Sequence, residues 1–425
     1  MTPPARPAIH RIVLQHLDDA AHLRSVRALL LRAPHIKLRD IERADERLSA
    51  HLDGLSISGD AGAQLSRSAL AVPGVGQIFV AAVLAIEQRD MPQIERLLSL
   101  LDSVSDAARA LPSAFGWVAP ASLRGLTPQL LAAPRPSARW LGVAACGLHS
   151  VDPGATLEQA LTQPHEGLAA RALRAAGELG RVDLLPACLA RLQDAAPALA
   201  WPAACASLML GDRRTAVQAL RSLAMAQGPV QLDALALALF TSDSEDARAL
   251  IKRLSTQGTP LRTLIKAAGW SGDSQVVPWL FEQMKATTHA RLACEAFSFI
   301  TGIDPAGLHL DSDAPQGAVE GPTDDPDDDN VGLDEDENLP WPDVEKMVAW
   351  WQANDSRFQP STRYFAGEPP SATHCISVLK NGFQRHRITA ARYLCLLQPG
   401  TQLFNVAAPA SRQQSMLAQM GARTR

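Results

Sequence analysis

Six stretches in the middle of the chain share one pattern, in which an apolar helical run ends at a turn and is followed by an aspartate. They are ARWLGVAACGLHSVD (138–152), ARALRAAGELGRVD (170–183), AWPAACASLMLGD (200–212), DALALALFTSD (233–243), RTLIKAAGWSGD (262–273) and ARLACEAFSFITGID (290–304). Their closing aspartates are 31, 29, 31, 30 and 31 residues apart. Such a constant period is typical of a repeat protein, in which each unit buries its apolar face against the next.

The closing aspartates are expected to begin a second helix in each unit, because a carboxylate accepts hydrogen bonds from the free N–H groups at a helix start. They are Asp152, Asp183, Asp212, Asp243, Asp273 and Asp304. Gly180, Gly211 and Gly272 precede three of them, as a helix C-terminus prefers. Short helical runs such as 184–192 and 246–254 follow. The predicted fold is therefore all-α, an α-solenoid of HEAT-like helix pairs with a small C-terminal helical module.

The chain of 425 residues is expected to divide into four segments. Residues 1–135 form irregular helical repeats, with helices over 10–32 and 39–53, and residues 136–310 form the regular stack. Residues 311–340 contain twelve acidic residues and no Lys or Arg, so they read as a loosely docked or disordered acidic linker. Residues 341–425 form the C-terminal helical module. The whole chain carries −4, so the rest of it carries +8.

The sequence lacks the signatures of catalytic, cofactor and metal sites. There is no G-x-S-x-G, no H-E-x-x-H and no phosphate loop. The alternating Asp325, Asp327 and Asp329 lack the glycine and the twelfth-position glutamate of a calcium loop. Six well-separated cysteines indicate buried thiols in a reducing cytoplasm, and no apolar run is long enough to span a membrane. We therefore predict a non-enzymatic cytoplasmic protein without cofactor, metal, catalytic residues or membrane contact.

Arginines supply the basic character of the folded part. Those of the middle repeats are Arg171, Arg174, Arg181, Arg191, Arg213 and Arg214. Nucleic-acid binding needs basic side chains concentrated in one stripe. A net charge of +8 outside the acidic segment is too small to indicate such a stripe. The run Gln384–Arg387 is expected to be the exposed face of a helix. Arg191, Arg221 and Arg253 lie near the ends of three second helices, so we predict that they contact a protein partner.

Several stretches resemble a bacterial family of uncharacterised HEAT-like repeat proteins that are often encoded near type VI secretion components. They are residues 13–55, ITGID (300–304), LPWPD (339–343), the Trp350–Trp351 pair, RYFAGEP (363–369), NGFQRHR (381–387) and APASRQQ (408–414). The resemblance covers most of the chain. It implies an accessory or adaptor role, such as handling an effector or spike component before secretion, and it brings no catalytic residues with it.

The predicted function is a protein-binding adaptor or chaperone-like scaffold whose groove takes an apolar or acidic surface of its partner. Three alternatives stay open. The first is an immunity protein that blocks a toxin. The second is a helical-repeat enzyme of lyase or base-excision type, which would have a cleft with converging Asp, Glu or Trp side chains and perturbed pKa values. The third is a nucleic-acid-binding protein with a basic face.

Overall fold

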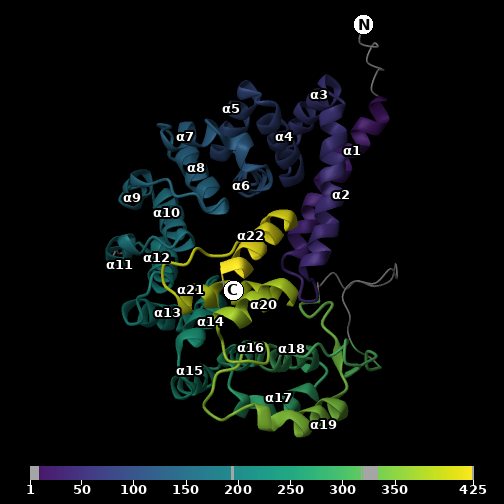
Figure 1. Cartoon of the computed structure of the whole chain (residues 1–425), viewed down its shortest axis with the longest axis vertical. Coiled ribbons are helices and arrows are strands. Elements are labelled where there is room, and N and C mark those ends of the chain that lie inside the picture. Colours follow the sequence, from purple (N-terminus) through teal and green to yellow (C-terminus); the bar gives the residue numbers. More distant parts are fainter. Residues whose placement is uncertain (1–8, 193–195, 317, 319–333, 424–425) are drawn as a thin grey trace. The chain divides into compact units, whose positions relative to one another are not determined.

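The computed structural model describes residues 9–192, 196–316, 318 and 334–423. Within this part, helices make up nearly all of the regular structure (Figure 1), and the only strands are two of two residues each. The predicted all-α class is thus confirmed. None of the described helices has the length and apolar character required to cross a bilayer.

The chain divides into two compact units, each containing distant parts of the sequence. Unit 1 contains residues 1–212, 380–384 and 398–425, and unit 2 contains residues 213–379 and 385–397. This division does not follow the expected segment boundaries. Residues 341–425, expected as one C-terminal module, are shared between the two units, because different parts of this segment pack on different helices.

Unit 1 is built from consecutive helices and short 3-10 turns. They are α1 (His10–Leu30), α2 (Leu38–Ile57), α3 (Asp60–Ser68), η1 (Ala69–Ala71), α4 (Val75–Gln88), α5 (Met91–Ser99), η2 (Leu100–Asp102), α6 (Ala107–Trp117), η3 (Pro120–Leu123), α7 (Leu126–Leu131), α8 (Pro136–Leu148), α9 (Ala155–Leu161), α10 (Glu166–Leu179), η4 (Val182–Leu184), α11 (Leu185–Leu192), α12 (Pro197–Met209) and α22 (Ala410–Arg423).

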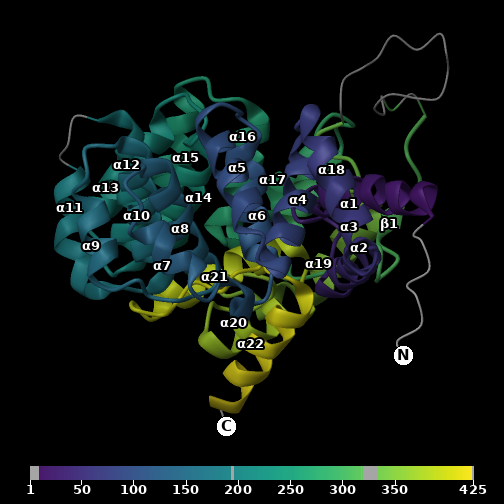
Figure 2. The ribbon, with the colours of Figure 1, turned by 90° about the horizontal axis from the view of Figure 1, so that it is seen from above.

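One layer of unit 1 runs through α1, α4, α6, α8, α10 and α12, each of which packs against the next. Figure 2 shows α8, α10 and α12 following one another in sequence order. Helices α5, α7, α9 and α11 pack beside this layer as the second members of the pairs. This packing of each layer helix on the next therefore begins at α1. Helix α2 runs past its expected end at Gly54, where an added Cβ would lie 2.8 Å from His16.

Small residues let the helices of this layer approach closely. A Cβ on Gly177 of α10 would lie 3.0 Å from the Cα atom of Ala206 in α12. Ala169, Ala172 and Ala176 of α10 are fully buried. Alanine and glycine leave little side chain between two backbones, so dispersion contacts form along the whole helix length. This explains why a chain with few aromatic residues can still form a tightly packed core.

Unit 2 repeats the arrangement with α14, α16 and α18 in sequence order, and α13, α15 and α17 as their partners. Its elements are α13 (Thr215–Met225), α14 (Gln231–Thr241), α15 (Ser244–Thr256), α16 (Leu261–Ser271), η5 (Ser274–Val276), α17 (Val277–Met284), α18 (Ala290–Thr301), β1 (Asp311–Ser312), β2 (Trp341–Pro342), α19 (Val344–Asn354), η6 (Asp355–Arg357), α20 (Ala372–Asn381) and α21 (Gln384–Leu397). The last two residues of α20 and the first of α21 belong to unit 1.

The closing aspartates act partly as predicted. Asp243 accepts a hydrogen bond from the backbone N–H of Asp246 and begins α15, and Asp273 accepts one from Gln275 at the start of η5. Asp152 instead accepts from Gly154 and pairs with Arg181 at 2.8 Å. These three aspartates thus close the turns in which they lie, and Asp243 and Asp273 also cap the helix or 3-10 turn that follows.

Two extended segments run across the C-terminal ends of the first helices. In unit 1, residues 398–409 (the C-terminal strap) lie there, with the N–H of Leu403 donating to the carbonyl of Glu178 at 2.8 Å. In unit 2, Tyr364 donates to Gly272 at 2.8 Å and Ala366 donates to Phe299 at 2.8 Å. Helix ends leave carbonyls without partners, and these segments supply the donors.

The glycines before the closing aspartates make room for these segments. Gly180 and Gly272 have φ of 67° and 65°, and a Cβ on them would lie 2.3 Å and 2.4 Å from the carbonyl oxygens of Gly400 and Tyr364. Glycine is therefore needed both for the left-handed backbone and for the close approach.

The expected acidic linker is ordered at both of its described ends, which corrects the prediction there. Strand β1 pairs with β2 in antiparallel fashion. Asp336 is only 5% exposed and accepts two hydrogen bonds from Arg262, at 2.9 and 2.6 Å, and Asp334 pairs with Arg291 at 2.6 Å. Residues 319–333, including the alternating aspartates considered for calcium, lie outside the described residues.

Candidate binding pocket

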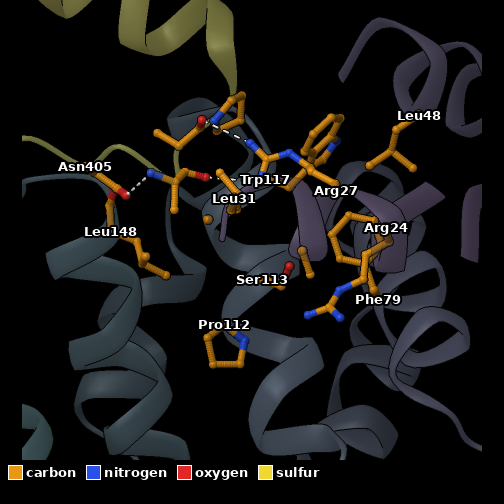
Figure 3. A pocket seen from close by; sticks show the side chains of 15 residues that line it. Arg24, Arg27, Leu31, Leu48, Phe79, Pro112, Ser113, Trp117, Leu148 and Asn405 are labelled. Carbon is orange, nitrogen blue, oxygen red and sulfur yellow. Dashed lines mark hydrogen bonds between the residues drawn. The ribbon is translucent and has the colours of Figure 1, made fainter. Parts of the chain in front are cut away.

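A pocket of about 190 Å³ in unit 1 lies between α1, α6 and the C-terminal strap (Figure 3). Its lining residues are Arg24, Arg27, Ala28, Leu31, Leu48, Phe79, Pro112, Ser113, Gly116, Trp117, Leu148, Asn405, Ala407, Ala408 and Pro409. It combines a largely apolar wall with two arginines and few other polar groups, as ligand pockets commonly do. We take it as the candidate functional site.

Arg24 and Arg27 both reach this pocket because residues three apart on a helix lie on the same face. Arg27 is fixed by several partners. Its Nε donates to Asp45 at 2.5 Å, and its terminal nitrogens donate to the carbonyls of Ala407 and Ala408 at 3.1 and 3.0 Å. Asp45 also accepts the N–H of Ala410 at 2.7 Å. Arg27 and Asp45 thereby join α1, α2, the C-terminal strap and the start of α22.

Arg24 is much less satisfied. Its Nε atom is buried and has no hydrogen-bond partner among the described residues, and one terminal nitrogen reaches the carbonyl of Arg109 at only 3.4 Å. Burial lowers the pKa of its guanidinium, and the charges of Arg109 and Arg27 lower it further, with Asp106 opposing them. The side chain extends toward Ser113 and Pro112 in Figure 3. A buried donor without an acceptor costs about 1–3 kcal/mol, so this position favours an incoming anion.

Aromatic rings form the apolar side of the pocket. Phe79 and Trp117 meet edge to face, with ring centroids 6.1 Å apart, and the guanidinium carbon of Arg27 lies 5.6 Å from the centre of the Trp117 ring. Leu31, Leu48 and Leu148 complete this wall. Trp117, Leu31 and Leu148 are partly exposed and offer area for a large apolar group at little conformational cost, while Phe79 and Leu48, 1% and 0% exposed, support them from behind.

Helix α6 contributes an unusual feature, because Pro112 lies inside it. Proline lacks the N–H that would bond the carbonyl four residues earlier and disturbs the helix locally. Pro112 and Ser113 line the pocket at this point. Three carbonyls at the end of α6 are held from outside, since Arg412 donates to those of Gly116, Trp117 and Val118.

His149 lies beside this region, in surroundings that favour its neutral form. Burial lowers the pKa of its ring, a hydrogen bond with the Phe115 carbonyl opposes that effect, and the charge of Arg412 lowers the pKa further. Nε2 lies 2.7 Å from the Phe115 carbonyl oxygen, which can only accept, so Nε2 carries the proton. The ring thus holds α6 and α8 together rather than supplying a charge.

The three predicted contact arginines lie in different environments. Arg191, in unit 1, donates to the carbonyl of Leu161 at 2.9 and 2.6 Å. Arg221 and Arg253 are both in unit 2, where Arg221 pairs with Asp246 at 2.5 Å and Arg253 is exposed. Two of the three thus link neighbouring helices, and their binding role stays a prediction.

Arg221 also lines a shallow recess of about 390 Å³ in unit 2 with Arg213, Arg214, Val217, Gln218, Thr241 and Asp246. Three of the arginines that give the middle repeats their basic character are paired with carboxylates: Arg171 and Arg174 with Glu178, and Arg181 with Asp152 and Asp183. These pairs reduce the basic character available to phosphates.

The basic run Gln384–Arg387 is buried, which corrects the expectation of an exposed face. His386 and Arg387 are 4% and 0% exposed, and the Nε of Arg387 donates to the carbonyl of Leu379 at 2.7 Å. Arg385 forms an ion pair with Glu295 of α18. Burial lowers the pKa of Arg387 to about 10 and raises that of Glu295 to about 7, with Arg385 opposing the rise. The charges are accommodated by polar partners that no helical-face pattern reveals.

The cysteines are free thiols, five of them buried and Cys205 partly so, and burial raises the pKa of Cys146 to about 11. No group of three His, Cys, Asp or Glu side chains within the described ranges could hold a metal ion. The sequence reasoning missed Arg24 and Trp117. The signal available for them was the proline inside the helical run 107–117, which marks a local irregularity.

No protein-family model matches the chain, and no curated protein matches it. One similar solved structure is an engineered protein with 15% identity, in which the alignment covers 68% of this chain and 93% of that chain at a TM-score of 0.32. A likeness this low supports no statement about fold or activity.

Proposed function

We propose that the chain is a non-enzymatic protein-binding adaptor or chaperone-like scaffold that helps to handle effectors of type VI secretion. The observation that carries the binding role is the unsatisfied guanidinium edge of Arg24 beside the aromatic wall of the pocket. Such a site is complementary to a partner group with both apolar and negative character. The secretion context rests on the family resemblance alone.

The architecture supports this role in a second way. Helical repeat proteins hold binding residues on rigid neighbouring helices, so a partner is recognised without large ordering costs. Here Arg24 and Arg27 come from one helix, Trp117 from another and Asn405 from the C-terminal strap. The pocket is thus assembled from parts of unit 1 that are already tied together by hydrogen bonds.

The test compares tagged full-length wild type with Arg24→Gln and Ser113→Phe in the organism that makes the protein. Arg11→Gln is the matched control, since Arg11 is an exposed residue of the same helix outside the pocket. Circular dichroism first establishes that each variant is folded.

We expect one protein to be captured by wild type and Arg11→Gln and reduced at least tenfold with both pocket variants. The purified partner should then bind the purified chain directly. If no captured protein depends on the pocket, the adaptor proposal is wrong. A pocket-dependent partner that has no part in secretion would contradict the type VI assignment and support the binding role.

A further inference from the structure

The size and charge of the pocket suggest what part of a partner it receives. This inference rests on the proposed binding function and specifies its ligand. We propose that the pocket binds the C-terminal residue of a partner protein, with a large apolar side chain against Trp117 and Leu148 and the α-carboxylate on Arg24.

The volume fits one residue. A cavity of about 150 Å³ lined by aliphatic and aromatic groups holds a benzene molecule. At about 190 Å³, this pocket has room for one benzyl or isobutyl side chain with its carboxylate, and it is too small for two large side chains. A chain terminus carries the apolar group and the carboxylate on the same Cα, so a single residue satisfies both walls.

The guanidinium edge of Arg24 suits a carboxylate. Its Nε has no acceptor among the described residues, and the neighbouring terminal nitrogen has only the 3.4 Å contact with Arg109. Because Nε is buried, the Arg24 side chain has to turn toward the pocket when the ligand enters. Two parallel N–H groups on one edge of a guanidinium bind the two oxygens of a carboxylate, a geometry that lysine cannot reproduce.

The local charge balance also favours an anion. Asp45 is occupied by Arg27 and by the N–H of Ala410. Asp45 therefore offsets part of the charge of Arg27, while the charges of Arg109 and Arg27 still act against a positive Arg24 and Asp106 opposes them. A bound carboxylate would offset the mutual repulsion of these arginines and the burial of Arg24.

The C-terminal strap explains the preference for a chain end over an internal acidic side chain. Asn405 and residues 407–409 form one wall of the pocket, and Asn405 is held to the carbonyl of Leu148 at 3.1 Å. An internal aspartate would bring only a short CH₂ group to the aromatic wall, and its chain would have to enter and leave past this wall. A terminus needs to enter only once.

The experiment titrates three probes into the full-length chain by calorimetry. They are N-acetylphenylalanine, its C-terminal amide, and the capped dipeptide acetyl-Phe-Asp-amide, whose only carboxylate is a side chain. The proteins are wild type, Arg24→Gln, Arg24→Lys and the control Arg11→Gln.

We expect N-acetylphenylalanine to bind wild type and Arg11→Gln equally within about twofold, and both the amide probe and Arg24→Gln to weaken binding about tenfold or more. Arg24→Lys should recover only part of the loss, because a single ammonium cannot form the paired contact. Affinity should also fall as salt is raised.

Three results would overturn the inference: equal binding of the acid and the amide, no effect of Arg24→Gln, or tighter binding of the capped dipeptide than of N-acetylphenylalanine. These results are separable from the test of function. If the cellular partner still depends on Arg24 while its C-terminus can be amidated or extended without effect, the adaptor role stands and the ligand class is wrong. If N-acetylphenylalanine binds as expected but no cellular partner depends on the pocket, the ligand class stands and the adaptor role is wrong.

Discussion

Replacing Asp45 by alanine should destabilise unit 1 strongly, because this carboxylate balances a buried charge. The side chains of Arg27 and Asp45 are 11% and 10% exposed and lie 2.5 Å apart. Removing one partner of a buried ion pair typically costs about 3–5 kcal/mol, since the other charge is left uncompensated. The N–H of Ala410 loses its acceptor as well. We expect a loss of about 4 kcal/mol in the free energy of unfolding of unit 1.

The double variant Asp45→Leu with Arg27→Met provides the control for this prediction. It removes both charges and replaces them with apolar side chains, so it should recover at least half of the lost free energy of unfolding. The part that is not recovered should come from the Ala410 N–H, which lacks an acceptor, and from the lost hydrogen bonds to the C-terminal strap. Without the ion pair, the start of α22 has no acceptor from α2, so α22 should open first.

Hydrogen exchange measured peptide by peptide is the suitable assay, because a chain with two compact units need not unfold in one transition. Exchange in α2, the C-terminal strap and α22 should accelerate in the single variant, while peptides of α14 and α16 serve as an internal reference. A loss of less than about 1 kcal/mol in the single variant, or a double variant less stable than the single one, would show that the Asp45 carboxylate does not balance the Arg27 charge as stated.

Three further predictions concern buried polar groups. Burial raises the pKa of Glu295 to about 7 from 4.5, so its favourable contribution is present below pH 4.5 and lost as the pH rises to 7. Glu295→Gln should remove this pH dependence. Urea denaturation should therefore show its free energy of unfolding rising relative to that of wild type, by up to about 3 kcal/mol, as the pH is raised from 4.5 to 7. Gly147→Ala should lower the free energy of unfolding by about 2 kcal/mol, because its Cβ would lie 2.4 Å from Arg171 and 2.5 Å from Glu178. The control Gly228→Ala, whose Cβ would have no atom within 4 Å, should leave the free energy of unfolding nearly unchanged. Thermal denaturation measures both. Arg171→Met should cost about 3 kcal/mol in the same assay, since Glu178 then keeps a buried charge with a weaker partner.

The helices of the middle region were predictable because their signals are local. The aspartate at each turn, the glycine before it and the apolar helical run lie within one unit, so their physical roles are visible in a short window. Asp243 and Asp273 cap the following helices as expected. The glycines also admit the extended segments at the helix ends, a second role that the sequence pattern did not indicate.

The pocket and the buried basic run were not predictable, because their partners are far away in sequence. Arg27 bonds to Ala408, which is 381 residues away, and Asp336 is buried by Arg262, which is 74 residues away. A helical-face argument assumes solvent on the polar side. At Arg387 that side faces the carbonyl of Leu379 instead. Periodicity assigns faces to a helix and cannot identify what packs against each of them.

The connection between the pocket and the end of the chain follows from the same distant contacts. Arg27 holds the carbonyls of Ala407 and Ala408, and its partner Asp45 holds the first N–H of α22. Arg24, one helical turn away, faces the same pocket. An anion on Arg24 would reduce the repulsion between the two arginines and so strengthen the bonds of Arg27 to the strap. By linkage, ligand binding and docking of the strap must then favour each other to the same extent.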